Sequence, residues 1–140
     1  MTNLPFTIAV DADGVLWEDR YPEIGAIRPE TIKALRWAQK QGVVLILNTC
    51  RSLGRLIGAL NAAHHADLHF DFINENDPAR IEAFGGDCRK VSADLYVDDK
   101  ALGWPGDDLS VARAIYAAVN AWLAARDGAA AEERDNSCQP

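Results

Sequence analysis

Acidic side chains follow two apolar segments of this sequence, at the points where those segments end. Asp11 comes directly after the run FTIAV, and Asp13 stands two positions later. Asp98 and Asp99 follow the run ADLYV. Bare carboxylates about 4 Å apart repel each other by roughly 4 kcal/mol at an effective dielectric constant near 20, so a proton or a cation must accompany them where they meet. Hard oxygen ligands that leave room for water suit Mg²⁺ better than Zn²⁺ or a Ca²⁺ cage, so the four aspartates predict a Mg²⁺ site.

A hydroxyl and an ammonium group extend this set. Thr49 lies two positions after the apolar run VVLIL, and Lys90 lies shortly before the run that ends at Asp98. Beside a bound Mg²⁺, Thr49 and Lys90 can hold the charge of a phosphate group. A carboxylate in line with the phosphorus can then attack it and form an aspartyl-phosphate. The residue types and their order therefore predict phosphoryl transfer.

The segments that must position these residues alternate between strands and helices. Four short apolar runs have the continuous hydrophobicity of strands that are buried on both faces of a parallel sheet; they span residues 6–10, 43–47, 70–73 and 93–97. Apolar residues recur at helical spacing in four segments, which begin at Pro29, after Ser52, at Pro78 and near Asp108. This order predicts an α/β fold, a Rossmann-like three-layer sandwich with a mostly parallel sheet. In such sheets ligands bind beyond the carboxyl ends of the strands.

Composition narrows the class of protein. The chain has 140 residues, 49% of them hydrophobic and 25% charged, which fits one domain over residues 1–125. Residues 126–140 contain no large apolar side chain and are predicted to form a flexible tail. The net charge of −7 disfavours nucleic acid or an anionic membrane as the main partner. Three cysteines without a repeated spacing, no signal-peptide pattern and no apolar run of about 20 residues favour a cytoplasmic protein with free thiols.

Together these motifs resemble those of the haloacid dehalogenase-like (HAD) phosphatase superfamily. DADGV at 11–15, a strand that ends in Thr49, Lys90, and YVDD at 96–99 have the order of its four motifs, over residues 6 to about 104. The segments RYPEIG, NTCR and DDKALGW are similar to a small capless (C0-type) subgroup of its hydrolases. The resemblance implies a HAD-like fold and a Mg²⁺-dependent phosphatase of phosphate monoesters.

The resemblance also implies a role for each aspartate. Asp11 is expected to be the nucleophile that becomes phosphorylated. Asp13 is expected to be the general acid for the leaving group and then the base for water, with its backbone carbonyl on the metal. Asp98 is expected to bind Mg²⁺ directly, and Asp99 to bind it through water or to orient the site.

Three further residues complete the expected site. Thr49 is expected to hydrogen-bond the phosphoryl oxygens, and Lys90 to neutralise the aspartate–phosphate pair. Arg89, beside Lys90, is the alternative for that role. Arg51 is a candidate for substrate binding, with an exposed arginine at the start of a helix as the equally weighted alternative.

Neither gap between the motifs is long enough for a lid domain. Only Val15 to Pro29 separate the first motif from the next helix, and 51–89 are taken up by two helices and a strand. The site is therefore expected to be open, covered by a short flap over residues 16–27 or by a neighbouring subunit of a homo-oligomer. An open site fits a phosphorylated small molecule or macromolecule.

Other functions are compatible with parts of this pattern. The same residues fit a non-catalytic module that binds metal and phosphate, or a phosphatase that acts on nucleic-acid ends, which the net charge disfavours. A phospho-signalling receiver would carry its phosphorylated aspartate after the third strand, where this chain has Asn74, expected to be a turn residue.

Histidines raise the question of zinc. His64 and His65 are adjacent on a predicted helix and point in different directions, so they do not share a metal easily. The sequence therefore favours solvated or partly packed histidines at His64, His65 and His69.

Overall fold

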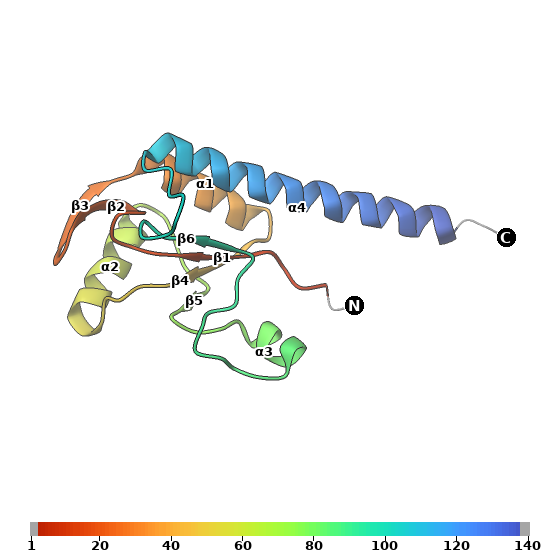
Figure 1. The fold of residues 1–140 in the computed structure, drawn as a ribbon, viewed down its shortest axis with the longest axis horizontal. Coiled ribbons are helices and arrows are strands. Elements are labelled where there is room, and N and C mark those ends of the chain that lie inside the picture. The colour runs from red at the N-terminus through yellow and green to blue at the C-terminus, as the bar shows by residue number, and fades with distance from the viewer. Residues whose placement is uncertain (1–2, 138–140) are drawn as a thin grey trace.

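A four-stranded parallel sheet forms the centre of the protein. The computed structural model describes residues 3–137. Their elements follow the predicted alternation of strands and helices, with two further strands between the first strand and the first helix (Figure 1). The strand order is β5-β4-β1-β6, made of Phe72–Ile73, Val44–Leu47, Thr7–Val10 and Leu95–Val97. Val10 at the end of β1 stands opposite Leu47 of β4 and Val97 of β6. The prediction of an α/β protein with a mostly parallel sheet is confirmed.

Four helices follow the strands along the chain and flank the sheet (Figure 1). They are α1 (Pro29–Lys40), α2 (Leu53–His65), α3 (Pro78–Phe84) and α4 (Asp108–Ser137). Proline opens both α1 and α3, where its fixed φ suits the first helical turn. At α3 the side chain of Asp77 accepts a hydrogen bond from the N–H of Ala79, and Gly85 ends the helix in the left-handed conformation.

The two faces of the sheet are buried unequally. Successive side chains of a strand point to opposite faces, so Ile8 and Val10 of β1 join a large apolar cluster that includes residues of α1, α2 and α4. Ala9 and Ile46 point the other way and form a smaller cluster with Val91. Burial on both faces explains why the strand sequences are apolar throughout rather than alternating.

A two-stranded antiparallel hairpin occupies the region between β1 and α1. It consists of β2 (Trp17–Arg20) and β3 (Glu23–Ile27), so the predicted flap is a β-hairpin. Most of its side chains are exposed, whereas Trp17 at its base is fully buried. The hairpin is therefore anchored at one end in the core and projects from the sheet at the other (Figure 1).

Helix α4 is longer than the sequence predicts. It continues to Ser137, so residues 126–137 are helical where a flexible tail was predicted, and their side chains are exposed. Alanine, glutamate and arginine in this segment are good helix formers, and they extend the helix without any core beneath it. Residues 138–140 of the predicted tail lie outside the described residues. Within residues 3–137, no helix combines the length and the apolar character that crossing a bilayer would require.

The amino end of α1 is capped by a residue of α4. Within the described chain, the N-cap residue Arg28 makes no side-chain capping hydrogen bond. Instead, the carboxylate of Asp108 accepts hydrogen bonds from the N–H groups of Glu30 (3.0 Å) and Thr31 (2.7 Å) and from the Thr31 hydroxyl (2.7 Å). Burial alone would raise the pKa of Asp108, yet these hydrogen bonds lower it below its ordinary value. The contact joins α1 to α4. These two helices pack along each other, and the ring centres of Trp37 and Tyr116 lie 5.0 Å apart between them.

Replacing Asp108 by alanine is expected to lower the free energy of unfolding by about 1–2 kcal/mol, because two helical N–H groups lose their partner. The change is measured by urea denaturation at neutral pH, with Asp135→Ala on the exposed end of α4 as the control. The pKa of Asp108 is lower in the folded state than its ordinary value of 3.8. Asp108 therefore stabilises the folded protein fully above pH 3.8, and this contribution is lost as the pH falls through the folded-state pKa. A difference between wild type and variant that stays constant into strong acid would contradict this role.

Candidate active site

An open cavity of about 580 Å³ lies beyond the carboxyl ends of β1, β4 and β6. Because parallel strands end at the same edge, the residues that follow Val10, Leu47 and Val97 meet there. The cavity, called the site cavity below, is lined by Asp11, Asp13, Asp19, Tyr21, Asn48, Thr49, Cys50, Arg51, Asp98, Asp99 and Lys100. Six of the predicted site residues are thus brought together, namely Asp11, Asp13, Thr49, Arg51, Asp98 and Asp99.

Three half-buried aspartates form the acidic centre of the cavity. Asp11, Asp98 and Asp99 each place one carboxylate oxygen within 4.8 Å of the other two. Among the described residues, no other group of three or more His, Cys, Asp or Glu side chains comes this close together. The N–H of Ala12 donates to Asp11 Oδ1 (2.9 Å), and the N–H of Lys100 donates to Asp98 Oδ1 (2.9 Å). Each of these two carboxylates is therefore oriented through one oxygen, which leaves its other oxygen available to a ligand.

Gly14 allows Asp99 to reach this cluster. A Cβ atom at position 14 would lie 2.2 Å from Asp99 Oδ2, and the φ of Gly14 is +82°. Both the close approach and the left-handed backbone require glycine. The glycine of the DADG motif thus makes room for a carboxylate from the far end of the sequence.

The cluster carries a strong negative field. Burial is the largest cause that raises the pKa of Asp11, to about 7, and the charges of Asp98 and Asp99 add to it, whereas the hydrogen bond from Ala12 partly offsets them. Three carboxylates in reach of one ion are the donor set of a hard divalent cation, and Mg²⁺ fits it better than softer metals. These residues therefore fit the ion that the sequence predicts.

Asp13 stands apart from that cluster, in an ion pair. Arg51 donates from Nε to Asp13 Oδ2 (2.7 Å) and from Nη2 to Asp13 Oδ1 (2.7 Å), and Trp17 Nε1 donates to Oδ1 (3.0 Å). Partial burial favours a higher pKa for Asp13, but the hydrogen bonds from Arg51 and Trp17 outweigh it and lower the pKa. The Asp13 carboxylate is thus an oriented anion bound to Arg51. The metal contact predicted through its backbone carbonyl stays a prediction.

Arg51 also connects the site to the flap. Its side chain is 2% exposed, and it donates to the carbonyls of Pro22 (3.1 Å) and Glu23 (3.0 Å) in the hairpin turn. The centre of the Tyr21 ring lies 5.0 Å from Cζ of Arg51 and 5.3 Å from Cζ of Arg55. Arg51 therefore holds Asp13 and the flap in one arrangement, and it is not the exposed arginine that was the alternative. Its predicted contact with substrate stays a prediction.

Thr49 is positioned by a residue for which the sequence predicted only a turn. The side chain of Asn74 accepts from the Thr49 N–H (2.8 Å) and donates to the Thr49 carbonyl (3.0 Å). The Thr49 hydroxyl oxygen accepts from the N–H of Arg51 (3.1 Å), so its own hydrogen is free to donate to a ligand. Asn74, which follows β5, thus positions the backbone of Thr49, and its place at the end of a strand was the available signal.

The predicted Lys90 does not line the site cavity. Lys90 is exposed, with Nζ 5.2 Å from the centre of the Tyr96 ring, and Arg89 lines a different hollow of the described surface. The physical reason is that the neighbouring Val91 packs against Ala9 and Ile46 under the sheet. Asn76, shortly after β5, donates to the carbonyls of Cys88 (2.9 Å) and Lys90 (3.5 Å), so the loop before β6 is held beside the segment that follows β5.

Lys100 is the lysine that the structure places in the cavity. Its Nζ lies 3.7 Å from Asp99 Oδ2, and its side chain is exposed. Lys100 is not among the predicted site residues, although it directly follows the Asp98-Asp99 pair. That position after a strand was the available signal.

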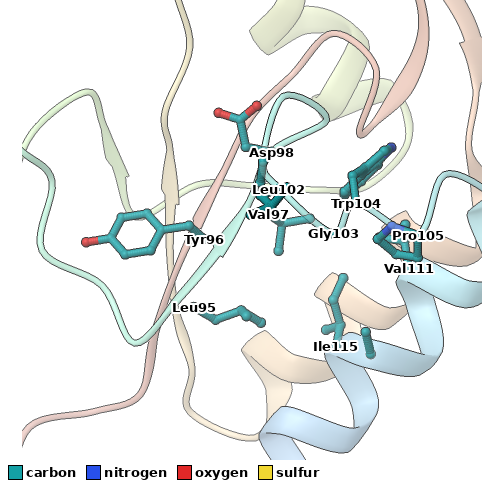
Figure 2. A pocket seen from close by; sticks show the side chains of 12 residues that line it. Leu95, Tyr96, Val97, Asp98, Leu102, Gly103, Trp104, Pro105, Val111 and Ile115 are labelled. Carbon is teal, nitrogen blue, oxygen red and sulfur yellow. The ribbon is translucent and has the colours of Figure 1, made fainter.

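Behind Asp98 lies a second hollow with a different character. It measures about 170 Å³ and is walled mainly by apolar side chains between β6 and α4. Figure 2 shows the Asp98 carboxylate pointing away from the apolar side chains of Leu95, Val97 and Ile115. This hollow therefore offers carbon surface, while the charged groups gather in the site cavity.

Comparison with known proteins shows one relationship clearly. No protein-family model matches the chain, and no curated protein matches it either. A solved structure of a conserved protein coded by a locus from Bacteroides thetaiotaomicron is 34% identical, with a TM-score of 0.69. The match covers 81% of this chain and 91% of that chain. The chain belongs to the same family as that conserved protein.

Replacing Asp11 by asparagine is expected to stabilise the metal-free protein at about pH 8, by at least about 1 kcal/mol. The folded state binds more protons than the unfolded state between the ordinary pKa of 3.8 and the folded value of about 7. The wild type therefore loses stability as the pH rises through this window, and the variant does not. Thermal unfolding in EDTA at about pH 5 and about pH 8 measures the difference. An equal difference at both pH values would contradict the raised pKa.

Proposed function

We propose that this protein is a Mg²⁺-dependent phosphohydrolase that acts on phosphate monoesters through an aspartyl-phosphate on Asp11. The observation that supports this most is the meeting of Asp11, Asp98 and Asp99 from two strand ends within reach of one cation. Thr49 and Lys100 beside them add the hydroxyl and the positive charge that a phosphate group needs. The order of the motifs, which resembles that of HAD phosphatases, agrees with this chemistry.

Asp11 is suited to attack phosphorus. Its Oδ1 accepts the Ala12 N–H, which fixes the carboxylate plane and leaves Oδ2 as the nucleophile. In the first step an Asp11 oxygen bonds to phosphorus while the bond from phosphorus to the leaving oxygen breaks. A Mg²⁺ ion bound at the cluster would neutralise the carboxylates and the phosphate charge and so keep Asp11 ionised.

Asp13 moves the protons of both steps. The leaving oxygen takes a proton from Asp13 in the first step, and Asp13 takes one back from the attacking water as the bond between Asp11 and phosphorus breaks. In the free protein Arg51 holds Asp13 as an anion, which is the form required for the second step. The charge of a bound phosphate raises the pKa of a nearby carboxyl, so substrate binding itself favours the acid form.

Lys100 takes the role that the sequence assigned to Lys90. It lines the cavity with Asp11 and Thr49, and its long exposed side chain can turn from Asp99 to a phosphate oxygen. The leaving group would lie toward the flap, where Tyr21 is 51% exposed at the rim. An open rim of this kind accepts small and large phosphorylated molecules.

The central test is the Mg²⁺-dependent hydrolysis of an aryl phosphate by the wild type and by Asp11→Asn. Loss of the nucleophile is expected to lower kcat by at least about a thousandfold, because no covalent intermediate can form. Asp135→Asn, on the exposed end of α4, serves as the control and is expected to keep full activity. A wild type that binds Mg²⁺ and phosphate without turnover would show the protein to be a binding module instead.

The variants Lys100→Met and Lys90→Met test which of the two lysines contacts the phosphate group. Loss of a charge-assisted contact to phosphate is expected to lower kcat/KM by about 10- to 100-fold in Lys100→Met. Lys90→Met is expected to stay within about twofold of the wild type, since Lys90 contacts Tyr96 outside the cavity. The measurement is steady-state hydrolysis of the same aryl phosphate, and the reverse order of the two effects would refute the role of Lys100.

A further inference from the structure

Two of the three histidines meet at the end of α2. His64 belongs to the last turn of that helix, and His69 lies in the segment before β5. Asp67 adopts a left-handed conformation (φ 58°) and Leu68 is buried, so the chain reverses after the helix. This reversal places His64 Nδ1 3.4 Å from His69 Nδ1, with the ring centres 4.9 Å apart.

The distance between these nitrogens matches that between two ligands of one metal ion. Zinc binds imidazole nitrogen at about 2.0–2.1 Å, and a tetrahedral angle then separates two such nitrogens by about 3.3–3.4 Å. Without metal, two neutral imidazoles can share only one proton between the facing Nδ1 atoms. A metal ion can take the place of that proton when the imidazole that carried it changes to the Nε2–H tautomer, by losing the Nδ1 proton to solvent and taking one from solvent at Nε2.

The surroundings of His69 fit a metal ligand. Its other ring nitrogen, Nε2, lies 3.7 Å from Asp67 Oδ1, and Arg36 Nη2 holds Asp67 Oδ2 at 2.7 Å. Histidines that bind metals commonly direct their second nitrogen at a carboxylate, which fixes the orientation of the ring. The Asp67 carboxylate, anchored to α1 by Arg36, is placed to do this.

The pair borders a surface hollow that is separate from the site cavity. Its lining residues are Leu60, Asn61, His64, Leu68, His69 and Phe70, none of which lines the site cavity. His64 and His69 are exposed, so an ion from solvent can reach both rings. His65 is also exposed, but its ring centre lies 6.4 Å from that of His64.

We propose that His64 and His69 form a second metal site, which binds a nitrogen-preferring divalent ion such as Zn²⁺, Cu²⁺ or Ni²⁺ through both Nδ1 atoms. Water completes the coordination shell. Imidazole ligands select these ions over Mg²⁺, which the aspartate cluster prefers, so the two sites differ in metal. With two protein ligands the site is weaker than a closed four-ligand zinc site. A bound ion would fasten the end of α2 to the segment that enters β5.

Zinc titration calorimetry on the full chain tests this proposal. Saturating Mg²⁺ is present to occupy the aspartate cluster, and Asp98→Asn provides a background in which that cluster is weakened. Wild type, Asp98→Asn and His65→Gln are expected to bind one Zn²⁺ with equal affinity. His64→Gln and His69→Gln are each expected to lose at least about tenfold, because one of two ligands is gone. Asp67→Asn is expected to lose about tenfold through the orientation of His69.

Copper provides a spectroscopic readout that does not depend on affinity alone. Cu²⁺ bound to the wild type and to His65→Gln is expected to show electron paramagnetic resonance coupling to two nitrogens, and His64→Gln to fewer. The three histidines are exposed, so the glutamine variants are expected to fold, which circular dichroism checks. Equal zinc affinity in His64→Gln and His65→Gln, or loss of zinc binding in Asp98→Asn alone, would overturn the proposal.

Discussion

Asp11, Asp98 and Asp99 bring three carboxylates to one edge of the sheet, within 4.8 Å of one another. Their repulsion would separate them in a flexible chain, and the pairing of β1 with β6 holds them together. The apolar side chains under that pairing are almost fully buried, so the core supplies the rigidity that the acidic edge needs. Burial at this edge is the main cause of the raised pKa of Asp11, and the charges of Asp98 and Asp99 add to it. Any function of the cavity depends on this enforced proximity.

Other aspartates in this acidic chain tie backbone groups of one element to side chains of another. Asp94 accepts from the N–H of Thr7 at the start of β1, and Asp71 accepts from the N–H of Leu45 in β4. Asp108 does the same for two N–H groups of α1. These partners satisfy donors that a short strand or a helix end leaves unpaired. Three of the 21 acidic residues thus have a structural role, which a whole-chain sum of −7 does not reveal.

Most of the fold could be predicted from local patterns. The strands are apolar throughout because both faces of the sheet are covered, and prolines mark the starts of α1 and α3. The helical end of α4 could not be predicted, because residues 126–137 contain no large apolar side chains at helical spacing. Helix propensity and continuity with the packed part of α4 keep residues 126–137 helical without burial.

The candidate site, like the fold, has parts that the sequence predicted and parts that it did not. Parallel strands end at one edge of a sheet, so the sequence by itself placed Asp11, Thr49 and Asp98 in one cavity. Side chains that act across loops were decided only by the tertiary structure. The path of the segment around Val91 kept Lys90 outside the cavity, and the turn at Asp67 joined His69 to His64. The succession of strands and helices along the chain follows from local sequence, whereas the path of a loop depends on long-range packing that local sequence does not encode.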